Sequence, residues 1–141
     1  MFKVKVLTIG KCKEPWLASA LSEYEKRLSP KVRIEWAIAK NDEQLIEWAA
    51  QEPFLIPLDP GGELLTSGRL SQKLIRLFEE KGSRLCFAIG GAEGLPKKLL
   101  DQFPFHLSLS PLTFTHQMTR LILIEQLYRS FEIEKGSGYH K

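Results

Sequence analysis

The segment SPLTFTHQMTR concentrates side chains that could bind an anion and move a proton. Four hydroxyl or imidazole side chains precede an apolar periodic run, namely Ser110, Thr113, Thr115 and His116. His116 and Arg120 lie four residues apart, so a helix places them on one face. The positive end of that helix and Arg120 would both favour an anionic group. Helix capping is the simpler interpretation, but a cap needs only one hydroxyl, so the segment favours a binding site.

A glycine-rich segment, IGGAEG at 89–94, follows a continuous apolar run and precedes a short helical pattern. Glycines there would let backbone N–H groups approach a ligand closely. The spacing is not G-x-G-x-x-G and no G-K-[ST] follows, so neither a dinucleotide fingerprint nor a Walker loop is indicated. Taken alone, the segment is better explained as a tight strand-to-helix turn.

The chain ends in Tyr139, His140 and Lys141, after the flexible Gly136 and Gly138. Chain termini usually fray, so a polar tail with a chance aromatic ring is the simplest interpretation. A terminus that combines a bulky ring, an imidazole and an ammonium group also allows a functional role, which these residues alone do not decide.

Composition excludes several other kinds of protein. There is no G-x-S-x-G elbow and no zinc-ligand spacing, and the three histidines are dispersed, so we expect no metal. Cys12 and Cys86 are too few for a disulfide framework. The formal net charge of +3 is compatible with a polyanionic partner but too small to indicate one. With no run of about 18 apolar residues and no signal-peptide core, we expect a cytoplasmic protein.

Hydrophobic periodicity predicts the elements that position these segments. Five strand patterns alternate with five helix patterns along the chain. We expect strands at 2–9, 32–39, 54–59, 85–91 and 105–110, and helices at 15–28, 41–50, 67–82, 96–102 and 115–133. The alternation predicts one α/β domain spanning 1–141, with a mainly parallel sheet flanked by helices.

A general rule for open parallel sheets indicates where a ligand would bind. Ligands of such sheets lie just outside the carboxyl ends of the strands. The rule selects three loops, LDPGG at 58–62, IGGAEG at 89–94 and LSPLTF at 109–114. The loops at 89–94 and 109–114 also carry the residue types that suit a binding site, so we expect the three loops to form one site.

The final predicted helix is apolar on two sides. Those sides are formed by Leu123, Leu127 and Phe131 and, nearly opposite, by Met118, Leu121 and Ile122. One core cannot easily cover both, so the second side predicts a subunit interface in a two-fold homodimer. Glu125 lies among the second set, and its carboxylate needs a partner such as Arg120 or Arg129 of either subunit.

Three segments together resemble a known family. FAIGGAEG, LSLSPLTFTHQMTRLILIEQLYR and the terminal YHK closely resemble the ribosomal RNA large subunit methyltransferase H family, of the SPOUT or trefoil-knot class. The resemblance implies an S-adenosylmethionine-dependent enzyme that methylates N3 of a pseudouridine in large-subunit (23S) ribosomal RNA as a homodimer. It also implies a carboxyl-terminal trefoil knot, which no periodicity would propose.

The resemblance assigns roles to individual residues. The family's cofactor-binding positions match Leu58, Gly90, Leu109, Ser110, Pro111, Leu112, Thr113 and Phe114. All of them fall in the three loops that the strand-end rule selects.

Methyl transfer to N3 requires alignment of the reacting atoms and loss of the N3 proton. The side chains available for this chemistry are His116, Arg120, Tyr139 and His140, with Lys141 as a further cation. With the resemblance, the tail is expected to be part of the RNA site, with Tyr139 stacking on the target base and Arg129 and Lys141 at RNA phosphates. Which residue removes the proton stays open at this level.

Two other functions remain as alternatives. A non-catalytic RNA-binding or ribosome-assembly protein with a knotted dimer fold would bind RNA without transferring a methyl group. A small nucleotide-binding α/β switch protein is disfavoured, because the chain has no phosphate-loop lysine.

Overall fold

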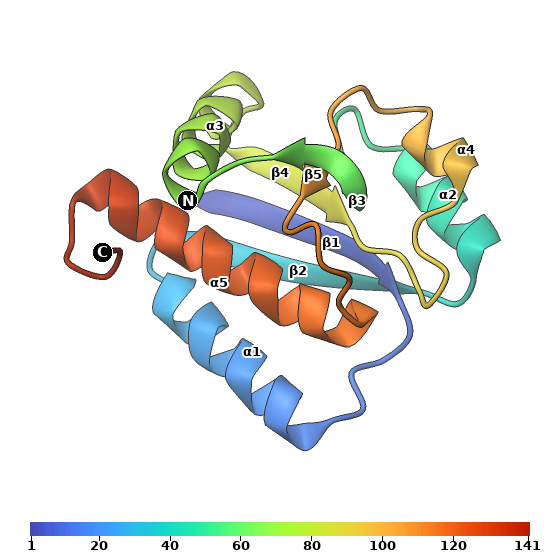
Figure 1. Ribbon diagram of the computed structural model, residues 1–141, viewed down its shortest axis with the longest axis horizontal. Helices are drawn as coiled ribbons and strands as arrows, with labels where there is room; N and C mark the ends of the chain where they lie inside the picture. The colour runs from blue at the N-terminus through green and yellow to red at the C-terminus, as the bar shows by residue number, and fades with distance from the viewer.

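The computed structural model describes residues 1–141 as a five-stranded parallel sheet with helices on both faces (Figure 1). The strands are β1 (Phe2–Ile9), β2 (Val32–Ala39), β3 (Ile56–Leu64), β4 (Arg84–Ala88) and β5 (Leu107–Ser108), in the order β2-β1-β4-β3-β5. The helices are α1 (Pro15–Leu28), α2 (Asp42–Ala50), α3 (Ser67–Glu80), α4 (Lys97–Leu100) and α5 (His116–Lys135). The predicted α/β architecture with a parallel sheet is confirmed. The trefoil knot stays a prediction.

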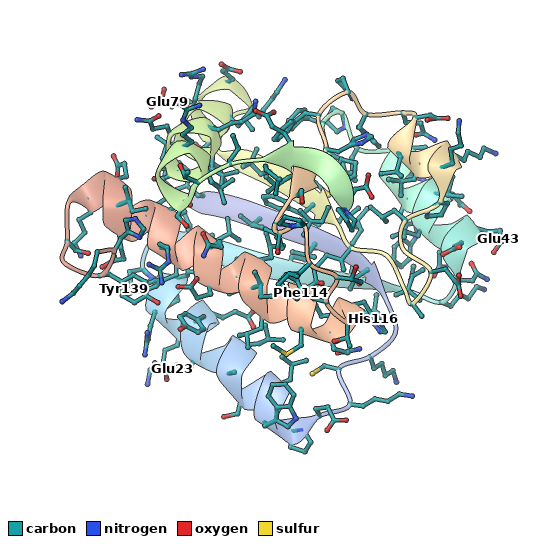
Figure 2. All side chains as sticks on the ribbon, viewed as in Figure 1. Glu23, Glu43, Glu79, Phe114, His116 and Tyr139 are labelled. Atoms are coloured by element: carbon teal, nitrogen blue, oxygen red, sulfur yellow. The ribbon has the colours of Figure 1, made fainter.

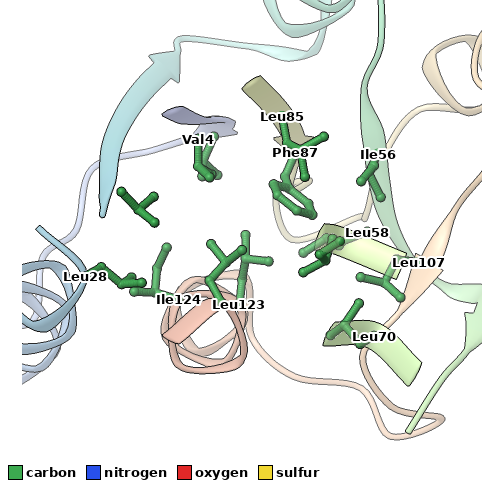
Figure 3. Packing of buried hydrophobic residues seen from close by; sticks show 14 of the residues in the cluster. Val4, Leu28, Ile56, Leu58, Leu70, Leu85, Phe87, Leu107, Leu123 and Ile124 are labelled. Carbon is green, nitrogen blue, oxygen red and sulfur yellow. The ribbon is translucent and has the colours of Figure 1, made fainter. Parts of the chain in front are cut away.

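The two faces of the sheet are covered unequally. Helices α1, α3 and α5 pack on one face, where Val4 and Phe87 of the sheet meet Leu123 and Ile124 of α5 (Figure 3). The shorter α2 and α4 pack on the other face, around a smaller cluster of nine buried residues that includes Leu7 of β1. Each helix presents an apolar stripe to the sheet, so burial of these stripes supplies the main stabilisation of the fold.

Strand β3 is longer than its hydrophobic pattern predicted. The segment Pro60-Gly61-Gly62, expected as a turn, continues the strand to Leu64, because the Glu63 N–H donates to the His106 carbonyl oxygen at 2.8 Å. The pairing with β5 is irregular between Leu58 and Glu63. A β-carbon on Gly62 would lie 2.6 Å from the His106 oxygen, so only glycine permits this crossing. Strand β5, predicted at 105–110, spans only Leu107–Ser108.

Helix α5 lies between α1 and α3, which accounts for part of its second apolar side. Leu123, on the first side, is 1% exposed, whereas Leu121 is half-buried and packs against the edge of the same core. Met118 and Ile122 are also only half-buried. The homodimer therefore stays a prediction, with these two side chains as its clearest apolar contribution from α5.

Candidate active site

The three loops selected by the strand-end rule surround one cavity of about 130 Å³ at the carboxyl edge of the sheet. Strands β4, β3 and β5 are neighbours, so their following loops meet there. The cavity is lined by Leu58, Asp59, Pro60, Ile89, Gly90, Gly91, Ala92, Gly94, Leu109, Ser110, Leu112, Thr113, Phe114, His116 and Thr119. Seven of the eight residues predicted to bind a cofactor are among them. Pro111 is the exception, since it is exposed and does not line the cavity.

Gly90 shapes the cavity through the packing of its own loop. A β-carbon there would lie 2.5 Å from both the Gly94 carbonyl oxygen and the Leu95 nitrogen. Gly94 itself has a φ of 80°, in the left-handed region that favours glycine. The sequence suggested that these glycines let a ligand approach. The structure shows that Gly90 is first required for the loop to fold back on itself.

The loop before α5 is held by its own hydroxyl groups. The Ser110 Oγ accepts a hydrogen bond from the Leu112 N–H at 2.9 Å, and the Ser108 Oγ donates to the Ser110 carbonyl oxygen at 3.0 Å. Thr115 is the N-cap of α5, since its Oγ1 accepts from the Met118 N–H at 3.2 Å. Capping therefore explains Thr115, whereas Thr113 lines the cavity without a hydrogen bond from its side chain.

His116 is the only histidine in the cavity lining. Partial burial lowers the pKa of His116, and the positive charge of Arg120 lowers it further. The imidazole is therefore neutral at pH 7 and can accept a proton.

Arg120 lies outside the cavity and is 2% exposed. Its Nη2 donates to the Ile9 carbonyl oxygen at 2.9 Å and to the Gly10 carbonyl oxygen. Burial lowers the pKa of Arg120, yet a guanidinium stays charged in proteins. In this arrangement Arg120 joins α5 to the end of β1 and influences the cavity through the pKa of His116.

Asp59 is a cavity residue that sequence reasoning missed. It is half-buried and is the only acidic residue in the lining, which contains no Lys or Arg. The strand-end rule had selected its loop, but nothing in the sequence distinguished this carboxylate from the other acidic residues. Its charge makes the cavity suitable for a ligand that carries a positive group.

The carboxyl-terminal tail is docked on the second half of α5. The Tyr139 hydroxyl donates to Glu125 Oε2 at 2.8 Å, and its ring meets that of Tyr128 edge-on, with centroids 4.8 Å apart. Arg129 lies over the same ring at 4.8 Å and pairs with Glu125 at 2.9 Å. Burial, the nearby Tyr24 hydroxyl and the hydrogen bond to Glu125 raise the pKa of Tyr139, so its phenol stays protonated.

The remaining tail residues extend into solvent. His140 is exposed, and its Nδ1 accepts a hydrogen bond from Arg129 Nη1 at 3.0 Å. Lys141 is exposed and makes no hydrogen bond or salt bridge. Arg129 is the partner that Glu125 was expected to need, and it comes from the same chain. Its contact with an RNA phosphate stays a prediction.

The predicted catalytic residues are not assembled within one chain. Figure 2 shows Phe114 and His116 at one end of α5 and Tyr139 near the other. Glu125, which holds the Tyr139 hydroxyl, is nine residues beyond His116, a rise of about 14 Å along the helix. The cavity and the tail are therefore separate features of a single chain.

Comparisons with known proteins decide the family. A family model described as "Predicted SPOUT methyltransferase" matches residues 2–140. The protein named "Ribosomal RNA large subunit methyltransferase H" from Protochlamydia amoebophila is 52% identical over 141 residues, covering all of both chains. The chain belongs to this family of SPOUT methyltransferases.

Other relatives agree with this membership. Proteins with the same name from Acetivibrio thermocellus and Halothermothrix orenii are 35% and 37% identical, each over 99% of both chains. A probable methylase family protein from Haemophilus influenzae superimposes with a TM-score of 0.62, at 10% identity, over 98% of this chain and 70% of its own. That likeness shows that the two proteins share a fold.

The structure contains neither a cluster of metal-binding side chains nor a helix that could span a membrane. No three His, Cys, Asp or Glu side chains of this SPOUT methyltransferase gather in a way that could hold a metal ion. None of its helices combines the length and the apolarity that crossing a bilayer requires.

Proposed function

We propose that this SPOUT methyltransferase, one domain over 1–141, methylates N3 of a pseudouridine in 23S ribosomal RNA in the cytoplasm. S-adenosylmethionine is the proposed donor, and a homodimer is the proposed active form. The observation that carries the proposal is the strand-end cavity, in which three loops bring an acidic group and a neutral imidazole together. Relatives named as ribosomal RNA methyltransferases support the choice of substrate.

The lining of the cavity fits a cofactor that carries positive charge beside an aromatic ring. Asp59 would attract the positive groups, and Leu58, Leu109 and Phe114 would pack on the adenine. When bound, S-adenosylmethionine supplies a methyl group on an electrophilic sulfonium. Leu112 is 71% exposed at the mouth of this small cavity, so its segment is the part that would move to enclose the ligand.

His116 is the proposed acceptor of the N3 proton. It lines the cavity and its pKa is lowered, so the neutral imidazole required of a base predominates at pH 7. Tyr139 is unsuited to that role, because its phenol stays protonated and donates to Glu125. Arg120 would act as a positioning residue, holding α5 and His116 against the end of β1.

The dimer would bring the two separated features together. Within one chain, His140 is held by Arg129, thirteen residues beyond His116, a rise of about 20 Å. A two-fold pair that packs through the half-buried side of α5 would place the tail of one copy near the cavity of the other. We propose that the RNA base is bound there, between His116 of one chain and a tail from its partner.

The test is transfer of a labelled methyl group from S-adenosylmethionine to ribosomes of a strain that lacks this protein. We expect label in one 23S nucleoside, identified by mass spectrometry as a pseudouridine methylated at N3. Matched ribosomes that lack the pseudouridine should accept little label. Equal labelling of the unmodified uridine would refute the specificity. RNA binding without transfer would instead support the non-catalytic alternative.

A further inference from the structure

A second cavity lies far from the proposed methyl-transfer site. It has a volume of about 540 Å³ and occupies the sheet face that carries α2 and α4, at the amino ends of the strands. Figure 1 shows α2 and α4 gathered toward the other end of the sheet, so they leave this part of the face open. The cavity is lined by Lys3, Val4, Lys5, Arg33, Glu35, Glu52, Pro53, Phe54, Lys81, Arg84, Leu85 and Cys86.

Three cations form a row across adjacent strands of this face. Lys3 of β1 is in register with Arg33 of β2 on one side and with Arg84 of β4 on the other. Neighbouring strands are about 4.8 Å apart, so these three residues, the basic row, span about 10 Å. Like charges directly opposite one another destabilise a sheet. A bound anion would offset the repulsion among these three charges.

No carboxylate of the chain neutralises the basic row. Lys3, Arg33 and Arg84 are exposed and form no salt bridge, whereas the next residue facing the same way, Lys5, pairs with Glu52 at 3.2 Å. Five basic and two acidic side chains line the cavity, a surplus of three. The lining of this cavity is therefore net positive.

We propose that the basic row binds successive phosphates of the RNA backbone, as a second contact remote from the target base. This inference rests on the proposed function, in that the polyanion is the RNA substrate. An open line of cations suits a chain of phosphates better than one small anion. Along β1, Lys3 lies six residue steps before Ile9, a rise of about 20 Å, and the proposed methyl-transfer cavity lies at the carboxyl end of the sheet. The row would therefore hold RNA that lies outside the reacting nucleotide.

The test compares two triple variants with equal loss of charge. The row variant carries Lys3→Thr, Arg33→Thr and Arg84→Thr, since threonine suits exposed strand positions. The control variant carries three exposed helical changes, Arg69→Gln, Arg76→Gln and Lys98→Gln. Circular dichroism checks that both are folded. The affinity for 23S RNA transcripts is then measured from 50 to 200 mM salt.

We expect the row variant to lose about two to three units of the slope of log affinity against log salt. The ratio of the wild-type RNA affinity to that of the row variant should accordingly fall roughly 16- to 64-fold between 50 and 200 mM salt. The control variant should keep the wild-type slope. In methyl transfer to ribosomes, the row variant should show a raised KM with kcat unchanged, because the row does not touch the reacting atoms.

Several outcomes would overturn the proposal. An unchanged slope in the row variant, or an equal loss in the control variant, would show that no specific contact exists. A change of sedimentation without a change of RNA affinity would assign the face to a second copy of the chain. If row-dependent RNA binding is found but ribosomes accept no methyl group, the basic row stands and the proposed function fails.

Discussion

Docking of the tail on α5 can be tested by removing the Tyr139 side chain. Tyr139→Phe deletes only the hydroxyl that donates to Glu125, and a hydrogen bond of this kind contributes about 1 kcal/mol. Tyr139→Ala also deletes the edge-on contact with Tyr128, worth about 1 kcal/mol, and the position of Arg129 over the ring, worth about 0.5 kcal/mol. We therefore expect the alanine variant to lose about 2 to 3 kcal/mol of unfolding free energy.

The measurement is urea unfolding at one fixed protein concentration, since dimerisation would make stability depend on concentration. In thermal unfolding at the same concentration, Tyr139→Ala should lower Tm by on the order of 10 °C, and Tyr139→Phe should lower it by roughly a third of that. Lys141→Ala is the matched control and should leave the urea midpoint unchanged, because Lys141 makes no salt bridge and is exposed. Equal urea midpoints for Tyr139→Ala and wild type would refute the docking. The tail would then be a frayed polar terminus, which is the simplest interpretation of its sequence.

Three further predictions concern the cavity and the second side of α5. The pKa of His116 is lowered from the ordinary histidine value near 6.5, so its imidazole stays neutral as the pH falls to that value. In a pH–rate profile, kcat should therefore decline only below about pH 6.5, and His116→Gln should abolish this decline. Asp59→Asn should weaken S-adenosylmethionine binding about tenfold or more in calorimetry, with unchanged circular dichroism, and undiminished affinity would remove Asp59 from the site. Ile122→Asp should convert a sedimenting dimer to monomer at micromolar concentration, and a wild-type monomer would contradict the interface itself.

Much of the fold could be predicted because its signals are local. Strand β1, helix α1 and strand β2 have the predicted bounds, since alternation and the 3.6-residue stripe are written in adjacent residues. The end of β3 could not be predicted in this way. Its PGG segment has turn residues, and only the distant carbonyl of His106 makes it a strand. Pairing with a partner far along the chain overrides local propensity.

The candidate site was likewise predictable only in part. The strand-end rule found its three loops, because parallel strands fix where their ends lie. It could not show that Pro111 turns away, or that Asp59 is the only acidic side chain in the cavity. The burial of Arg120 was likewise invisible, since its partners are the carbonyl groups of Ile9 and Gly10, more than a hundred residues earlier.

The bond from Arg120 to Ile9 also constrains when the chain can fold. It joins residues 111 apart, and the ring of Phe2 packs 5.3 Å from that of Phe131. A ribosome that adds 5 to 20 residues per second would need roughly 6 to 22 s to pass from Ile9 to Arg120. Throughout that time β1, although made well before α5, lacks the helix that covers it. Strand β1 therefore reaches its native packing only after α5 has been synthesised, and until then its apolar residues are open to wrong partners.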